Sequence, residues 1–262
     1  MFPARPGLES VRWRDLLRLS RGEVSRELAL PLPWLAASWV AAAHELYAFA
    51  LCASFMFFLT GLRQVHNAYH YALGISRKGT EGVMFLLSVL MLGSMHAVQL
   101  THLLHHRSCM KHDDVEAMSA RMPGWRALLV GPLFPLRLHR KALAIAGARH
   151  RRWIRAELAA NVALLFVVLA VLDVAWLRYH VLAMLLGQCL TAFFAVWTVH
   201  HDCDPDGVLA RTIRNRLKAI VTYDMFYHVE HHLFPGVPTR KLPVLARRLD
   251  EVAPELASKK VF

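Results

Sequence analysis

Two long apolar runs constrain the fold of this chain more than any other feature of its sequence. Leu46–Leu62 and Val181–Thr198 contain 17 and 18 residues and no charged side chain. As α-helices they would reach about 25–27 Å. That length is close to the thickness of the hydrocarbon core of a bilayer, so both runs predict membrane-spanning helices.

Two further apolar runs complete a predicted set of four spans. Ala159–Leu177 has the required length although it contains two polar residues. Leu28–Ala43 is shorter and has Pro31 and Pro33 near its start, but proline is tolerated near the N-terminus of a helix. The predicted fold is therefore an all-α integral membrane protein with four transmembrane helices in two hairpins, formed by a single domain over residues 1–262.

The basic residues predict the orientation of these spans. The chain is 56% hydrophobic, yet it has 31 Lys and Arg residues and a formal net charge of +12. Almost all basic residues lie in an N-terminal arm (1–27), in Arg107–Arg155 and after Asp202. Such segments stay on the cytoplasmic side of a membrane, here expected to be a bacterial inner membrane. Nucleic-acid binding would explain only the charge, so no nucleic-acid partner is expected.

A fifth apolar run, Val83–Leu100, lies between two groups of histidines. If those histidines build one site, they must lie on the same side of the membrane. The run is therefore expected to enter and return, or to lie along the interface. Its polar residues, which include His96 and Gln99, also make a span surrounded by lipid unfavourable.

The histidines form repeated motifs. Eight of the 16 histidines make one HxxxH and two HxxHH boxes: His66, His70, His102, His105, His106, His228, His231 and His232. On a helix, residues i, i+3 and i+4 share a face, so each box presents its imidazoles together. Imidazole binds iron, zinc, copper and nickel, and eight or nine rings exceed what one ion accepts. The pattern therefore predicts two metal ions.

The order of the boxes, with HVEHHLFPGVP over His228–Pro238, resembles the membrane fatty-acid desaturase superfamily of histidine-box di-iron desaturases, hydroxylases and ketolases. The resemblance covers Leu28–Glu255 and implies a cytoplasmic helical cap that carries the boxes. It implies that the eight box histidines bind two non-haem iron ions. The family usually adds one ligand from the end of the last hairpin, where either His200 or His201 fits and His201 is preferred.

This resemblance implies an oxidoreductase with O2 as co-substrate. The expected reaction introduces a double bond into the acyl chain of a fatty acid or membrane lipid. The alternatives are a related hydroxylase or ketolase acting on a carotenoid or other apolar chain and, from another class, a His-rich metal transporter. No fused cytochrome b5 signature is present, so a separate electron donor of the ferredoxin, rubredoxin or cytochrome b5 type is expected.

Residues outside the boxes give weaker signals. Five carboxylates near the boxes are candidates to hydrogen-bond the ligand imidazoles: Asp113, Asp114, Asp202, Asp224 and Glu230. His96 is turned about 120° from the box that begins at His102, whereas Gln99 is better aimed at the site. Arg137–Arg155 is expected on the membrane surface or as a docking site for an acidic carrier. The remaining isolated histidines are expected at the surface or interface: His44, His139, His150 and His180.

Overall fold

Helices make up almost all of the regular structure of the chain. The computed structural model describes residues 8–204 and 208–261, so the first seven residues of the predicted N-terminal arm lie outside the described part. Within the described part there is no strand, and one isolated bridge pairs Thr212 with Lys260. The predicted all-α membrane fold is confirmed.

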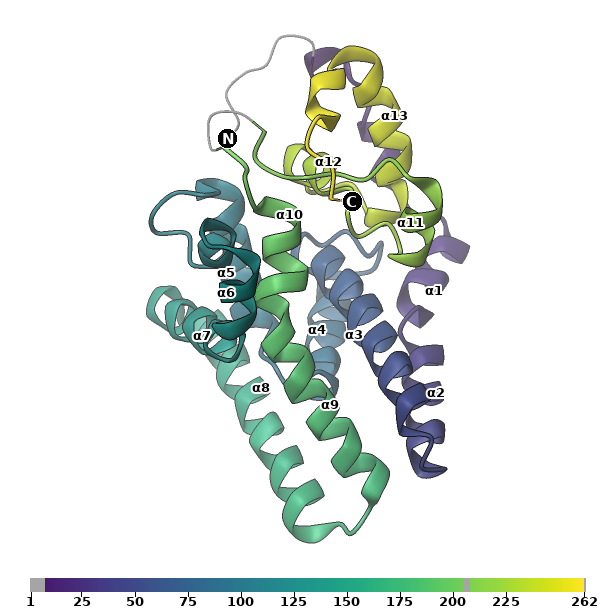
Figure 1. The fold of residues 1–262 in the computed structure, drawn as a ribbon, viewed down its shortest axis with the longest axis vertical. Coiled ribbons are helices and arrows are strands. Elements are labelled where there is room, and N and C mark those ends of the chain that lie inside the picture. The colour runs from purple at the N-terminus through teal and green to yellow at the C-terminus, as the bar shows by residue number, and fades with distance from the viewer. Residues whose placement is uncertain (1–7, 205–207, 262) are drawn as a thin grey trace.

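Three of the described helices are long and apolar enough to cross a bilayer. They are α3 (Tyr47–Tyr69), α8 (Ala148–Phe166) with its extension to Val171, and α9 (Ala175–Thr191) with its extension through α10 (Thr198–His200). The pair α8 and α9 forms one hairpin, and α2 (Leu32–Ala43) forms another with α3. Figure 1 shows the turns of both hairpins at the same end of the bundle.

The first and third expected spans differ from the sequence prediction in their bounds. The run Leu28–Ala43 is divided between α1 (Arg21–Ala29) and α2. With 12 residues, α2 extends about 18 Å and does not by itself cover the hydrocarbon core. The third span ends at Val171 instead of Leu177, because Leu172 has extended backbone. Apolar patterns mark the middle of a helix better than its ends.

The run Val83–Leu100 is folded as a bent pair of helices, α4 (Arg77–Leu90) and α5 (Met95–Ser108). Their axes differ by 112° across a short break, so α5 turns away from the path of α4. This agrees with the expectation that the run does not cross the membrane as one straight helix. Two shorter helices, α6 (Gly124–Leu129) and α7 (Phe134–Ile145), then lead to α8.

Short helices cover the end of the bundle opposite the hairpin turns. They are α11 (Arg216–Val221), α12 (His228–Leu233) and α13 (Leu242–Val252) (Figure 1). The leucines of α13 recur at helical spacing and are buried in one cluster with Val229 of α12. This packing fixes α12 over the end of the bundle.

Buried polar contacts fasten α3 to its neighbours at the same end. The guanidinium of Arg63 lies 2.8 Å from the carboxylate of Glu27 in α1. The side-chain oxygen of Asn67 accepts hydrogen bonds from the backbone N–H and the hydroxyl of Thr239, at 3.0 and 2.8 Å. Asn67 directly follows His66, so the first histidine box is tied to the segment between α12 and α13.

Candidate metal centre

Four segments bring nine histidines together at the covered end of the bundle. They are His66 and His70 at the end of α3, His102, His105 and His106 in α5, His200 at the end of α10, and His228, His231 and His232 in α12. Both HxxHH motifs are helical, so each presents three rings on one helix face. The nine rings form two groups.

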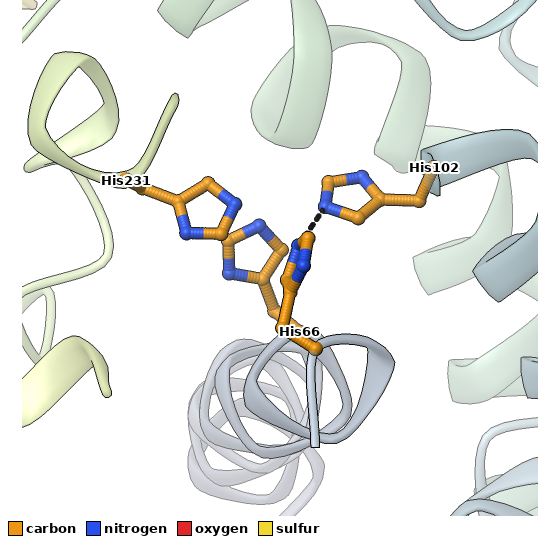
Figure 2. A group of neighbouring side chains, drawn as sticks. His66, His102 and His231 are labelled. Atoms are coloured by element: carbon orange, nitrogen blue, oxygen red, sulfur yellow. Dashed lines mark hydrogen bonds between the residues drawn. The ribbon is translucent and has the colours of Figure 1, made fainter. Parts of the chain in front are cut away.

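The first group contains His66, His70, His102 and His231, whose ligating nitrogens all lie within 4.8 Å of one another. Figure 2 shows the labelled rings of His66, His102 and His231 converging from three separate segments. The Nε2 atom of His66 is buried and has no hydrogen-bond partner, which is costly unless a ligand is bound there. His106 adds a fifth ring, because its Nε2 lies 2.9 Å from that of His231.

The second group contains His105, His200, His228 and His232, again with all ligating nitrogens within 4.8 Å of one another. All four rings are buried. The Nε2 atom of His200 lies 3.1 Å from that of His105 and 3.0 Å from that of His228. The four nitrogens therefore surround one small volume, as the ligands of a single ion do.

The two groups are direct neighbours. The ring centroids of His66 and His228, one from each group, are 6.0 Å apart, and those of His102 and His105 are also 6.0 Å apart. A set of buried imidazoles divided in this way fits two adjacent transition-metal ions.

The histidine that the last span contributes is His200, and the preference for His201 is corrected. The Nδ1–H of His200 donates to the carbonyl oxygen of Leu209 at 2.8 Å, which directs Nε2 toward the second group. The ring of His201 instead stacks on Trp197 at 3.8 Å, and its Nε2 lies 4.0 Å from Asp202. The stacking on Trp197 therefore directs the ring of His201 away from the cluster.

Two carboxylates orient the rings of α5. Asp114 Oδ2 lies 2.7 Å from Nδ1 of His105, and Glu116 Oε1 lies 2.8 Å from Nδ1 of His102. Asp114 also accepts the backbone N–H groups of Met110, Glu116 and Ala117, which fixes its position in the loop after α5. Such partners select the tautomer that leaves Nε2 free to bind a metal.

The other four predicted carboxylates lie elsewhere. Glu230 is buried in α12 and accepts the hydroxyl of Thr212 at 2.7 Å. Asp113 and Asp202 are exposed. Asp224 precedes α12, which begins only at His228, so the expectation that it shares a helical face with that histidine is wrong.

The environment of α12 keeps its histidines uncharged. Burial, with a further contribution from the neighbouring imidazoles, holds the pKa of His228, His231 and His232 well below the ordinary value. A neutral imidazole has the free lone pair that a metal ion requires. The rings of the third box are therefore in the form that binds metal at neutral pH.

Comparison with known families agrees with this geometry. A family profile described as fatty acid desaturase matches residues 37–259, which include all nine clustered histidines. The chain belongs to the fatty acid desaturase family. Members typically hold two iron ions, and the two imidazole groups suit such a pair. No curated protein gives a significant match to the chain.

An apolar cavity of about 300 Å³ adjoins the histidine cluster of this desaturase-family protein. Its walls come mainly from α3 and α9, and His66, His102 and His228 line it where it meets the histidine cluster. Gly187 of α9 allows the two helices to approach, because a Cβ atom there would lie 2.7 Å from a ring carbon of Phe58. The cavity therefore joins both imidazole groups to the interior of the membrane bundle.

Glu116 was not predicted from the sequence of this desaturase-family protein. It lies 14 residues beyond His102. The sequence between them has no continuous helical pattern, so it did not indicate that the two side chains meet. Gln99 was expected near the site, and its amide donates to the carbonyl oxygen of Tyr69 at 3.1 Å, next to His70.

The isolated histidines follow the predictions only in part. His96 is buried and pairs with Glu157 at 2.6 Å, outside both metal groups. His180, expected at the surface or interface, is buried, and its Nε2 lies 2.9 Å from the carbonyl oxygen of Leu90. Among the others, His44 is exposed, and His139 and His150 are partly exposed.

Proposed function

We propose that this chain is an O2-dependent di-iron desaturase that introduces a double bond into the acyl chain of a fatty acid or lipid. The observation that supports this most directly is that both imidazole groups border one apolar cavity, through His66 and His102 of the first group and His228 of the second. A long apolar substrate fits such a cavity. One carbon pair of that chain would then lie beside the metal centre.

One set of residues would hold the metals, and another would hold the substrate. The nine imidazoles hold the two iron ions, which supply the oxidising power that an unactivated C–H bond demands. Asp114 and Glu116 fix the ring orientations in α5. The apolar walls of the cavity exclude water and set which carbon faces the metals, so the position of the double bond follows from geometry.

The reaction also requires a source of electrons. Removing two hydrogens from the substrate while O2 becomes two water molecules needs two additional electrons and two protons. A separate donor of the ferredoxin, rubredoxin or cytochrome b5 type would deliver the electrons. The basic segments of the chain support a location of the metal centre on the cytoplasmic side of a bacterial inner membrane.

Product analysis tests this proposal. The protein is expressed in a host with a simple lipid composition, supplied with O2, and its acyl chains are analysed by mass spectrometry. A desaturase yields chains that are lighter by two hydrogens, and a His228→Ala variant expressed to the same level yields none. Incubation under 18O2 shows whether oxygen enters the product.

Products that retain an 18O atom would contradict desaturation and establish a hydroxylase or ketolase in its place. Unchanged lipids, together with metal movement across the membrane in the absence of O2, would instead support a transporter. The position of the nine clustered histidines weighs against transport, because they gather at helix ends and in α5 and α12 and do not follow a path through the spans.

A further inference from the structure

The metal-binding helix α5 begins inside the bundle, where its first backbone N–H groups are cut off from water. Residues 94–97 at this end are each no more than 2% exposed. The first N–H groups of a helix have no partner within the helix, and inside a membrane protein they must be satisfied by other protein groups.

Side chains from three other helices satisfy these groups. The N–H of Ser94 donates to Nε2 of His139 in α7, and the N–H of Met95 donates to the hydroxyl of Ser88 in α4, both at 2.9 Å. The N–H of His96 donates to Glu157 in α8 at 3.2 Å. The next N–H, that of Ala97, donates to the hydroxyl of Ser94 at 3.1 Å.

Glu157 is the centre of this arrangement. Its carboxylate is fully buried, about 14 Å along α8 from the first residue of that helix. The hydroxyls of Ser88 and Ser94 donate to its two oxygens at 2.7 and 2.5 Å, and Nδ1 of His96 lies 2.6 Å from Oε1. With the backbone N–H of His96, one carboxylate therefore contacts α4, the break between α4 and α5, and α5 itself.

A second contact holds α5 to α8 at the same level. The ring of His96 stacks on Trp153, which lies one turn before Glu157, with centroids 4.8 Å apart and planes inclined by 1°. The carboxylate also lies near the N-terminus of α5, where the helix dipole stabilises negative charge. The depth and the rotation of α5 are thus set where it leaves the bend.

The position of the N-terminal end of α5 determines where the histidines at its other end lie. His102 lies six residues after His96, about 9 Å along the helix axis, and α5 gives rings to both metal groups, through His102 and His105. A rotation of α5 by one residue would turn these rings about 100° from the metal centre.

We propose that Glu157 is a positioning residue of the metal centre: by fixing the buried start of α5, it sets the ligand geometry of both ions without touching either. This rests on the proposed di-iron function. Loss of the carboxylate removes none of the nine imidazoles, but it lets α5 shift and rotate together with His102 and His105.

The test uses the full-length protein in lipid nanodiscs, loaded anaerobically with ferrous iron. Iron release to a ferrous chelator and the Mössbauer spectrum are recorded for Glu157→Ala and Glu157→Gln. We expect Glu157→Ala to release iron about tenfold faster, as loss of a ligand-orienting group does, and to give a spectrum with more than one environment at each iron. Glu157→Gln, which keeps an acceptor oxygen, falls between this variant and the wild type.

Asn161→Ala is the matched control, because Asn161 is also buried and lies one turn further along α8. It should keep the release rate and the spectrum of the wild type even if its melting temperature falls. Release by folded Glu157→Ala within threefold of this control, with an unchanged spectrum, would overturn the role of Glu157 alone. If Glu157→Ala does not fold, Glu157→Gln decides by the same criteria. A wild type without an iron pair would instead remove the proposed function itself.

Discussion

Replacing His200 with alanine should abolish turnover, whereas replacing the adjacent His201 should leave it within about twofold of the wild type. His200 belongs to the second imidazole group, with Nε2 about equally distant from His105 and His228 at 3.1 and 3.0 Å. Loss of this ring removes a ligand. Replacing a residue that only orients a ligand lowers activity by up to about 100-fold, so we expect His200→Ala to lower turnover by at least about 100-fold.

The two variants form a matched pair, because they remove the same ring from neighbouring positions. Bound iron and acyl-chain products are measured together for both. His200→Ala should hold about one iron fewer per chain. Equal losses in both variants, or a larger loss for His201→Ala, would contradict the assignment of His200 to the centre.

Replacing Gly187 with leucine should lower the conversion of long acyl chains on the order of 100-fold while iron content stays unchanged. A Cβ atom at this position would lie 2.7 Å from the ring of Phe58, so the ring must move into the cavity that both residues line. Phe58 precedes His66 by eight residues, about 12 Å along α3. A chain that extends this far is displaced, and a displacement of about 1 Å at the reacting carbon costs about 100-fold in rate.

Chains too short to reach Phe58 should react at nearly the wild-type rate, so a series of chain lengths is compared. Gly82→Leu is the matched control, because Gly82 lies in α4 and a Cβ atom there has nothing within 4 Å. Equal conversion of all chain lengths by Gly187→Leu and the wild type would show that the substrate does not occupy this cavity.

The convergence of the box histidines was largely foreseeable, because the spacing that produces it is local in the sequence. The spacing of the boxes at His102 and His228 already places three rings on one helix face, whatever the rest of the chain does. Apolar length likewise identified α3 and α9, since the thickness of a bilayer sets how long a span must be.

What the sequence did not predict depends on contacts between distant segments. Glu116 and Glu157 lie in parts of the chain that have no histidine box, and only the fold brings them to His102 and His96. The choice between His200 and His201 depends on the rotation of the last turn of the span. The ring of His201 stacks on that of Trp197, and no local sequence pattern predicts that contact.

Iron analysis combined with Mössbauer spectroscopy of the purified, lipid-embedded protein tests most directly whether the clustered imidazoles hold a pair of iron ions. We expect two irons per chain in nitrogen-rich sites. Both irons should be lost when His102 of the first group and His228 of the second group are replaced by alanine together, while the protein stays folded. A fully active preparation with one metal ion per chain or none would contradict a di-iron centre held by these histidines, and so would a double variant that keeps both ions.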